Sequence, residues 1–261
     1  MKTIYHPSGL TFEAPQKYAP GKVLLLVCWH LYDRPREAIM LLEKERDLLV
    51  EYGKKLITNR LTTGTGGNLS IFNRHKQLIA ITPTGLDYFQ TKPEDIVVLQ
   101  PGGEILEGKR SPSSELTMHR FFYQHRDDID SLVHVHSKYA TTLSCLHWEL
   151  PAVHYLVAVA GAKVKCAQYA TFGSEELARN GFEAMKASKA VLLANHGLLA
   201  GGKDLPTAFA ITEDIEFCAE IYYHAKCIGE PAIIPASEMD VVAEKLKGYL
   251  YKNGPKQKRK I

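Results

Sequence analysis

The chain has 261 residues, 45% of them hydrophobic, and its 32 Lys and Arg almost balance its 29 Asp and Glu. A chain of this length and composition can bury a full core, and it fits one large domain better than two small ones. Much of the net charge of +3 lies near the C-terminus, at 256–260, and no other basic or aromatic patch accompanies it. We interpret this segment as a solvated basic tail, which argues against nucleic acid or a membrane surface as a partner.

The cysteines and the apolar segments indicate a soluble protein of a reducing compartment. The five cysteines are odd in number and none has C-x-x-C spacing, which is typical of free thiols. The apolar run at 23–29 is too short to span a bilayer and lacks the flanks of a signal peptide. We therefore expect a cytoplasmic location.

The first half of the chain changes from an irregular segment to a helix and then to strands. Residues 1–36 are rich in proline and aromatic residues without a clear period, and only a short strand at 23–29 is expected there. From Glu37 to Ile57, apolar residues recur at intervals of three and four, which predicts a long amphipathic helix. Short apolar segments bounded by turn residues then predict strands at 69–72, 77–82 and 96–99.

The second half alternates helices and strands. Ser113-Ser114-Glu115 has the composition of a helix cap, so a helix is expected from there to about residue 125, followed by a strand that contains two histidines. The remaining pattern predicts strands at 152–159 and 190–194 and helices at 174–187, 205–228 and 240–252. No internal repeat is present, and no low-complexity linker divides residues 40–252.

His134 and His136 are the most informative residues of the chain. Successive side chains of a strand alternate between its two faces, so these two imidazoles point the same way. A third histidine, His196, follows downstream in an Asn-His-Gly turn. A lone histidine on a strand is usually an ordinary polar residue, but two side by side with a separate His-Gly turn favour a metal site. Three histidines with one open position are typical of a catalytic zinc rather than a structural one.

Three turns of small residues accompany the histidines. The segment 64–70, Gly-Thr-Gly-Gly-Asn-Leu-Ser, lacks the glycine spacing of a dinucleotide site or a P-loop, and alone it is more typical of a hairpin turn. The segment 82–85, Thr-Pro-Thr-Gly, is also an ordinary turn by itself. Ser113 and Ser114, in contrast, lie where a helix begins, and exposed N–H groups and hydroxyls there form an anion site. Turns of this kind that converge beside a metal would hold a phosphate.

Seven segments together resemble the class II aldolase/epimerase family, and within it the fuculose-phosphate aldolases. They are Gly-Gly-Asn-Leu-Ser (66–70), Ile-Thr-Pro-Thr-Gly (81–85), Pro-Ser-Ser-Glu (112–115), His-Val-His (134–136), His-Tyr (154–155), Tyr-Ala-Thr-Phe-Gly (169–173) and Asn-His-Gly-Leu (195–198). They occur in family order, and seven ordered motifs are far more specific than any one of them.

The resemblance implies an architecture. It implies a single three-layer α/β/α domain around a mostly antiparallel central sheet, assembled as a homotetramer with active sites between subunits. The domain is expected at residues 40–252. Residues 1–39 would be an N-terminal extension without a counterpart in the family, and residues 253–261 a basic C-terminal tail.

The resemblance also implies roles for individual residues. It assigns His134, His136 and His196 to Zn²⁺, and it assigns Glu115 to proton transfer and to a fourth ligand position in the absence of substrate. Tyr155 matches a tyrosine that is contributed across the subunit interface, and Tyr249 matches one on a C-terminal segment. The phosphate of the substrate is assigned to Gly67, Asn68, Thr84, Gly85, Ser113 and Ser114.

The reaction implied by the resemblance is the retro-aldol cleavage of a deoxy-ketose 1-phosphate. Cleavage of the C3–C4 bond leaves dihydroxyacetone phosphate as an enediolate, and zinc stabilises its negative charge as a Lewis acid. Glu115 would exchange a proton with the enediolate carbon, and Tyr155 with the C4 oxygen. Fuculose 1-phosphate, which gives lactaldehyde as the second product, is the expected substrate. 5-Deoxyribulose and methylthioribulose 1-phosphates are the alternatives.

Other assignments stay open at this point. A Schiff base on Lys138 would be a rival electron sink, but a complete metal site makes it superfluous. His119, one helical turn after Glu115, is expected to pack or to support the site rather than to bind the metal. Because His154 and Tyr155 are neighbours in an expected strand, at most one of them faces the site. An epimerase or dehydratase of the same superfamily is an alternative activity, whereas a non-enzymatic adducin-like binding module would lack the metal set.

Overall fold

The computed structural model of this chain describes residues 40–252, without the side chains of 247–252. The strand expected at 23–29 and the basic tail at 253–261 lie outside the described residues. Leu41–Ile261 forms a compact unit of its own. In the part that is described, no helix combines the length and the apolar character needed to cross a membrane.

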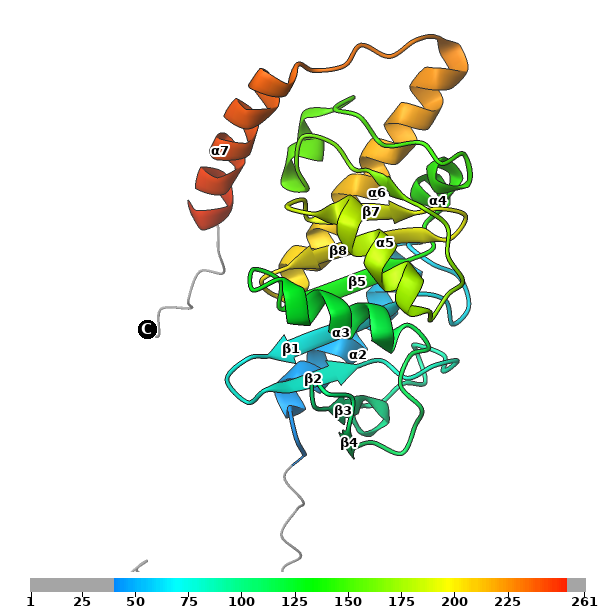
Figure 1. Cartoon of the computed structure of the whole chain (residues 1–261), viewed down its shortest axis with the longest axis vertical. Coiled ribbons are helices and arrows are strands. Elements are labelled where there is room, and N and C mark those ends of the chain that lie inside the picture. The colour runs from blue at the N-terminus through cyan, green and yellow to red at the C-terminus, as the bar shows by residue number, and fades with distance from the viewer. Residues whose placement is uncertain (1–39, 253–261) are drawn as a thin grey trace, which may run out of the picture. The chain divides into compact units, whose positions relative to one another are not determined.

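An eight-stranded sheet runs through this unit (Figure 1). The strands are β1 (Asn68–Asn73), β2 (Leu78–Ile81), β3 (Val97–Leu99), β4 (Ile105–Glu107), β5 (Ser131–Val135), β6 (Cys166–Ala167), β7 (Ala190–Leu193) and β8 (Gly197–Gly202). Their order across the sheet is β4-β3-β2-β1-β5-β8-β7-β6. Every neighbouring pair is antiparallel except β6 and β7, so the sheet is mostly antiparallel as expected.

Helices cover both faces of the sheet. They are α2 (Glu43–Thr58), α3 (Leu116–His125), α4 (Lys138–Cys145), α5 (Glu175–Met185), α6 (Leu205–Ile228) and α7 (Ala236–Lys252). One buried cluster joins α3 and α5 to one face, and another joins α2, α4 and α6 to the other. Adjacent residues of β5 enter different clusters, Leu132 the first and Val133 the second, because side chains alternate along a strand. The expected three layers, α/β/α, are confirmed.

Local signals in the sequence explain where several helices begin. The carboxylate of Asp204 caps α6 by accepting from the N–H of Thr207 (2.8 Å), and the hydroxyl of Ser174 caps α5 by accepting from the N–H of Leu177 (3.1 Å). The helices expected at 174–187 and 205–228 are therefore confirmed, with small differences at the ends. Residues 37–39 of the helix expected from Glu37 lie outside the described residues. Helix α2 begins at Glu43, because the preceding residue, Leu42, has a left-handed φ of 55° that interrupts an α-helix.

The strand expected at 152–159 does not form. Tyr155–Val159 is instead a short 3-10 helix, η2, which is capped by His154: its Nδ1 accepts from the N–H of Leu156 (3.3 Å). A short apolar run fits a strand or a buried helical turn equally well, so periodicity alone could not decide between them. The expectation that His154 and Tyr155 point to opposite faces is consequently wrong, and their rings lie 4.5 Å apart.

The sequence pattern also missed β4, β6, β8 and α4. In β8, three of six residues are glycine, which weakens the signal of a strand. The glycines allow close packing: a Cβ on Gly201 would lie 2.7 Å from Cδ1 of Ile129, and one on Gly202 would lie 2.6 Å from the backbone nitrogen of Ala208 in α6. Glycine in this strand therefore reflects the close approach of the loop before β5 and of α6.

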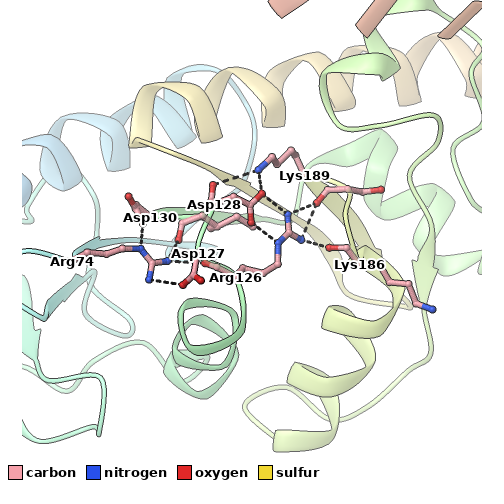
Figure 2. A network of polar contacts seen from close by, with 9 residues as sticks. Arg74, Arg126, Asp127, Asp128, Asp130, Lys186 and Lys189 are labelled. Carbon is pink, nitrogen blue, oxygen red and sulfur yellow. Dashed lines mark hydrogen bonds and ion pairs between the residues drawn. The ribbon is translucent and has the colours of Figure 1, made fainter. Parts of the chain in front are cut away.

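A network of charged side chains fixes the loop that leads from α3 into β5 (Figure 2). Arg126 forms a two-pronged ion pair with Asp128 (2.7 and 2.9 Å) and also donates to the backbone carbonyl of Lys186, just after α5. Arg74, just after β1, donates to the backbone carbonyl of Arg126 (2.7 Å) and pairs with Asp130. The loop is thereby fastened to α5 on one side and to β1 on the other.

Arg46 in α2 is a fully buried charge. Its guanidinium donates to the backbone carbonyls of Leu41 (2.6 Å), Pro93 (2.9 Å) and Ile96 (2.6 Å) and pairs with Glu107 of β4 (2.8 Å). Burial lowers the pKa of Arg46, and the nearby carboxylate of Glu107 opposes this effect. The side chain joins the first turn of α2 to the segments beside β3 and β4.

We predict that Arg46→Ala lowers the free energy of unfolding by about 3–5 kcal/mol, because the buried carbonyls and Glu107 lose their partner. Arg110→Ala is the matched control. Arg110 also forms an ion pair, with Asp95 (2.8 Å), but its side chain is 53% exposed, and the loss of an exposed pair costs about 1 kcal/mol or less. Urea unfolding followed by circular dichroism measures both variants. Equal losses would contradict the role given to Arg46.

Candidate active site

Three histidines converge at one end of β5 and β8. His134 lies in β5, His136 follows directly after that strand, and His196 precedes β8, the antiparallel neighbour of β5. The ring centroids lie 4.7–5.1 Å apart, and the Nε2 atoms of His134 and His136 lie 3.0 Å apart. All five residues of β5 are buried, so His134 lies inside the fold rather than on a solvated face. The structure thus brings together the three imidazoles that the sequence singled out.

Glu115 completes this cluster from the start of α3. The hydroxyl of Ser113 accepts from its backbone N–H (3.2 Å). Its carboxylate oxygens lie close to two of the histidines, with Oε2 3.0 Å from Nε2 of His134 and Oε1 3.4 Å from Nε2 of His196. Glu115 and the three histidines each offer a ligand atom, and these four atoms lie within 4.8 Å of one another.

The donor set fits a divalent metal ion. A tetrahedral zinc with bonds of about 2.0–2.1 Å to nitrogen holds its ligand atoms about 3.3 Å apart, close to the separations just given. Nδ1 of His134 faces the backbone carbonyl of Leu198 (3.0 Å), and donation there leaves the Nε2 lone pair free for a metal. Burial, together with the neighbouring imidazoles, lowers the pKa of His136 and of His196 to about 4, so both rings are neutral ligands at pH 7.

The negative charge on Glu115 also favours a metal ion at this site. Burial alone would raise its pKa, but His134, His196 and the amide of Asn68 outweigh this effect and hold the pKa well below its usual range. Oε1 is buried and has no hydrogen-bond partner among the described residues. A buried, ionised oxygen without a hydrogen-bond partner is the atom that would contact a cation or accept a proton.

A pocket of about 330 Å³ opens in front of the cluster. It is lined by Glu115, His136 and His196. It is also lined by every residue that the sequence analysis assigned to phosphate, namely Gly67, Asn68, Thr84, Gly85, Ser113 and Ser114. Three turns that are distant in the sequence therefore meet beside the histidines.

The turn at Gly67 admits no side chain. Its φ of 73° lies in the left-handed region, and a Cβ there would lie 2.6 Å from the backbone oxygen of His134. Glycine at this position therefore lets the turn approach the strand that carries two of the histidines. The backbone of the turn stays accessible from the pocket.

Four other residues named in the sequence analysis lie elsewhere. Tyr155 is 48% exposed and does not line the pocket. Lys138, at the start of α4, is exposed and also does not line it. His119 is fully buried beneath the cluster and is not one of the four candidate ligands. Tyr249 belongs to α7, and its side chain lies outside the described residues.

Two aromatic residues line the pocket, although the sequence analysis gave neither of them a role. Tyr169 and Phe172 are 58% and 66% exposed and come from the loop between β6 and α5. Both belong to the motif at 169–173, so the sequence analysis had singled out this segment. Nothing in the motif indicated a chemical role for either residue. A Cβ on Gly173 would lie 2.9 Å from the backbone oxygen of Ser114, which explains how this loop packs against the serine turn.

Comparisons with known proteins agree with this site. Residues 47–223 match the family model described as Class II Aldolase and Adducin N-terminal domain. A 5-deoxy-D-ribulose 1-phosphate aldolase of Bacillus thuringiensis is 57% identical over 80% of this chain and 99% of its own length. An L-fuculose phosphate aldolase of Escherichia coli is 39% identical over 72% of this chain and 87% of its own length.

A solved structure extends the comparison to three dimensions. The structure of an L-fuculose 1-phosphate aldolase superimposes with a TM-score of 0.78 at 53% sequence identity, covering 80% of this chain and 99% of the other. The matched family segment, 47–223, contains all four residues of the histidine and glutamate cluster. The chain therefore belongs to the class II aldolase family, and it is a lyase.

Proposed function

We propose that this enzyme cleaves the C3–C4 bond of a deoxy-ketose 1-phosphate and releases dihydroxyacetone phosphate and an aldehyde. One observation carries the proposal. The ionised carboxylate of Glu115 lies beside three imidazoles in a pocket that is also lined by three turns of small residues. Such a pocket offers a phosphate site, a metal site and a base within reach of one small substrate.

His134, His136 and His196 would hold the metal, which we propose is zinc, and Glu115 would be a fourth ligand in the absence of substrate. A divalent ion bound there would supply Lewis-acid stabilisation of the negative charge that cleavage leaves on the substrate. The histidine set favours zinc over magnesium or calcium, which prefer oxygen ligands.

The phosphate would be held by the turns. Ser113 and Ser114 precede α3, where free N–H groups and the helix dipole favour an anion. Thr84 and the backbones at Gly67 and Gly85 line the same pocket. Because the phosphate lies far from the reacting bond, its binding energy would serve to orient C3 and C4 against the catalytic groups.

Glu115 would move the proton at C3. In the synthetic direction its ionised carboxylate takes a proton from C3 of dihydroxyacetone phosphate, and in the cleavage direction the same group returns it. Oε1, the oxygen without a hydrogen-bond partner among the described residues, is the one available for this step. Tyr155 would exchange the proton of the C4 oxygen. Tyr155 is exposed and does not line the pocket of its own chain, which leaves its side chain available to a neighbouring subunit. We also propose the homotetramer that the resemblance implies.

The identity of the aldehyde half is the finer part of the proposal. Two relatives, 57% and 53% identical to this chain, are named for different substrates, 5-deoxy-D-ribulose 1-phosphate and L-fuculose 1-phosphate. Both substrates are deoxy-ketose 1-phosphates that give dihydroxyacetone phosphate, with acetaldehyde in the first case and lactaldehyde in the second. The identity of 57% supports 5-deoxyribulose 1-phosphate as the preferred substrate, ahead of the fuculose 1-phosphate expected from the motifs.

Two wider proposals accompany the activity. We place the catalytic domain at residues 40–252, because the matched family segment, 47–223, and the seven motifs all lie there. We also propose a reducing, cytoplasmic location, which is supported by the free thiols of Cys145, Cys166, Cys218 and Cys227.

The substrate panel tests the proposal directly. We predict release of dihydroxyacetone phosphate from both 5-deoxyribulose and fuculose 1-phosphates, with the higher kcat/KM for the first. A coupled reduction of dihydroxyacetone phosphate measures the rates, and chromatography identifies the aldehyde. Conversion of substrate without release of dihydroxyacetone phosphate would indicate an epimerase or dehydratase instead.

Removal of any one histidine should lower metal content and turnover together. We predict this for His134→Ala, His136→Ala and His196→Ala, because a site with three protein nitrogens loses both a ligand and its geometry when one imidazole is removed. Elemental analysis measures the metal, and the aldolase assay measures turnover. His75→Ala is the control, since His75 lies in the β1–β2 turn outside the pocket. A variant that binds zinc as tightly as the parent and stays fully active would remove that histidine from the site.

The two proton transfers should separate by mutation. Exchange of the C3 proton of dihydroxyacetone phosphate with solvent requires the base but no aldehyde, whereas cleavage also requires proton transfer at the C4 oxygen. We predict that Glu115→Gln loses both reactions, while Tyr155→Phe keeps exchange and loses cleavage by about 10²-fold or more. Deuterium uptake followed by NMR measures exchange. Loss of exchange in Tyr155→Phe to the level of Glu115→Gln would contradict this division.

A further inference from the structure

A chain of buried polar side chains leads away from Glu115 into the core. The amide nitrogen of Asn68 donates to Oε2 of Glu115 (2.8 Å), and the amide oxygen of Asn68 lies 2.6 Å from Nε2 of His119. Nδ1 of His119 lies 2.6 Å from the hydroxyl of Ser70, which lies 2.5 Å from the hydroxyl of Tyr123. All five residues are buried, and the contacts beyond Asn68 take no part in the chemistry described above.

The chain follows from the spacing of residues on two elements. Asn68 and Ser70 are two residues apart in β1 and share one face of the sheet. Glu115, His119 and Tyr123 are four residues apart along α3, so they share one face of the helix. Two residues of a strand span about 6.6 Å and four residues of an α-helix span about 6 Å. The side chains of β1 and those of α3 therefore lie opposite one another.

The ionised end of the chain fixes the direction of the first two hydrogen bonds. A carboxylate only accepts, so Asn68 must turn its NH₂ group towards Glu115 and its carbonyl oxygen towards His119. That oxygen can only accept, so Nε2 of His119 must carry a hydrogen and donate it. The contact therefore selects one of the two neutral tautomers of His119.

The remaining bonds complete the order. Nε2 of His119 faces the amide oxygen of Asn68 and Nδ1 faces the hydroxyl of Ser70, so a neutral ring satisfies both contacts. With its hydrogen on Nε2, Nδ1 is an acceptor, and the hydroxyl of Ser70 must donate to it. The hydroxyl of Ser70 then accepts from that of Tyr123, whose pKa is raised by burial so that it keeps its hydrogen.

We infer that His119 is a positioning residue: it donates from Nε2 to the amide oxygen of Asn68 and so fixes the orientation of that amide. Asn68 then restrains Oε2 of Glu115 and leaves Oε1 towards the pocket. The inference rests on the proposed role of Glu115 in proton transfer. Without the donor on His119, the amide of Asn68 would lose the partner that sets its orientation. The carboxylate would then be restrained less tightly, and an error of about 1 Å at a reacting group costs about 10²-fold in rate.

The first experiment observes the tautomer without an activity assay. Long-range ¹H–¹⁵N correlation NMR on the ¹⁵N-histidine-labelled wild-type protein distinguishes Nε2–H from Nδ1–H rings, and His119→Gln assigns the His119 signals by their loss. We expect a neutral Nε2–H ring for His119 from pH 6 to pH 9. An Nδ1–H tautomer or a charged ring in this range would overturn the inference.

The second experiment separates positioning from stability. His119→Leu removes both ring nitrogens, and we expect kcat to fall by about 10- to 100-fold while KM and metal content stay within about threefold of the wild type. His119→Gln places an amide N–H near the former Nε2 and should restore kcat to within about fivefold of the wild type.

Tyr123→Phe is the matched control on the same face of α3. It removes a buried hydroxyl and should lower the urea midpoint, but Ser70 still donates to His119, so kcat should stay within about threefold of the wild type. An unchanged kcat in His119→Leu, or an equal loss of kcat in Tyr123→Phe, would overturn the inference.

The controls distinguish this inference from the proposed function. If wild-type protein cleaves no ketose 1-phosphate, or if Glu115→Gln keeps full turnover, the proposed function is wrong. If both behave as proposed and His119→Leu is fully active, only the role of His119 is wrong. Should His119→Leu fail to fold, the tautomer in the wild type and the effect of Asn68→Leu on that tautomer decide the matter. Asn68→Leu removes the oxygen that selects Nε2–H, so it is expected to introduce the Nδ1–H form, and a spectrum unchanged by Asn68→Leu counts against the inference.

Discussion

The close pairing of β5 with β8 is the constraint on which the site depends. His134 faces Leu199 and Val135 faces Leu198 across this pair, so the turn before β8 lies beside the end of β5. Gly197 makes the approach possible, because a Cβ there would overlap the backbone oxygen of Val135. Without a side chain at this position, the imidazole of His196 can meet those of the other two histidines. The absence of a side chain at Gly197 thus permits the geometry of the whole cluster.

The sequence predicted the part of the site that lies within one strand and could not predict the part made by tertiary contact. Alternation along the expected strand placed His134 and His136 on one side without any knowledge of the fold. The pairing that brings His196 to them was invisible, because the glycines of β8 do not have the pattern of a strand. The cap before α3 located Glu115, but only the resemblance connected it with the histidines.

The same distinction applies to the fold as a whole. Helices with a clear cap and a long period, such as α6, were predicted closely, whereas the short apolar segment at 152–159 was assigned to the wrong class. The order of the eight strands, in which β1 lies between β2 and β5, depends on packing between distant segments. The resemblance supplied the layers, and local pattern alone would have left the arrangement undetermined. His119 is an intermediate case: its spacing from Glu115 was visible, but the partner row on β1 was not.

The network in Figure 2 also fixes the permissible length of a helix. Glu115 lies at one end of α3, and Arg126, at the other end, is held to α5 and to the loop before β5. One additional residue within α3 would rotate its two ends relative to each other by about 100° and lengthen it by about 1.5 Å. With the far end held, that error would appear at Glu115, so the number of residues between Glu115 and Arg126 sets the position of the Glu115 carboxylate relative to the histidines. Insertions and deletions in this segment should therefore be rare among working relatives, although most of its residues never approach the substrate.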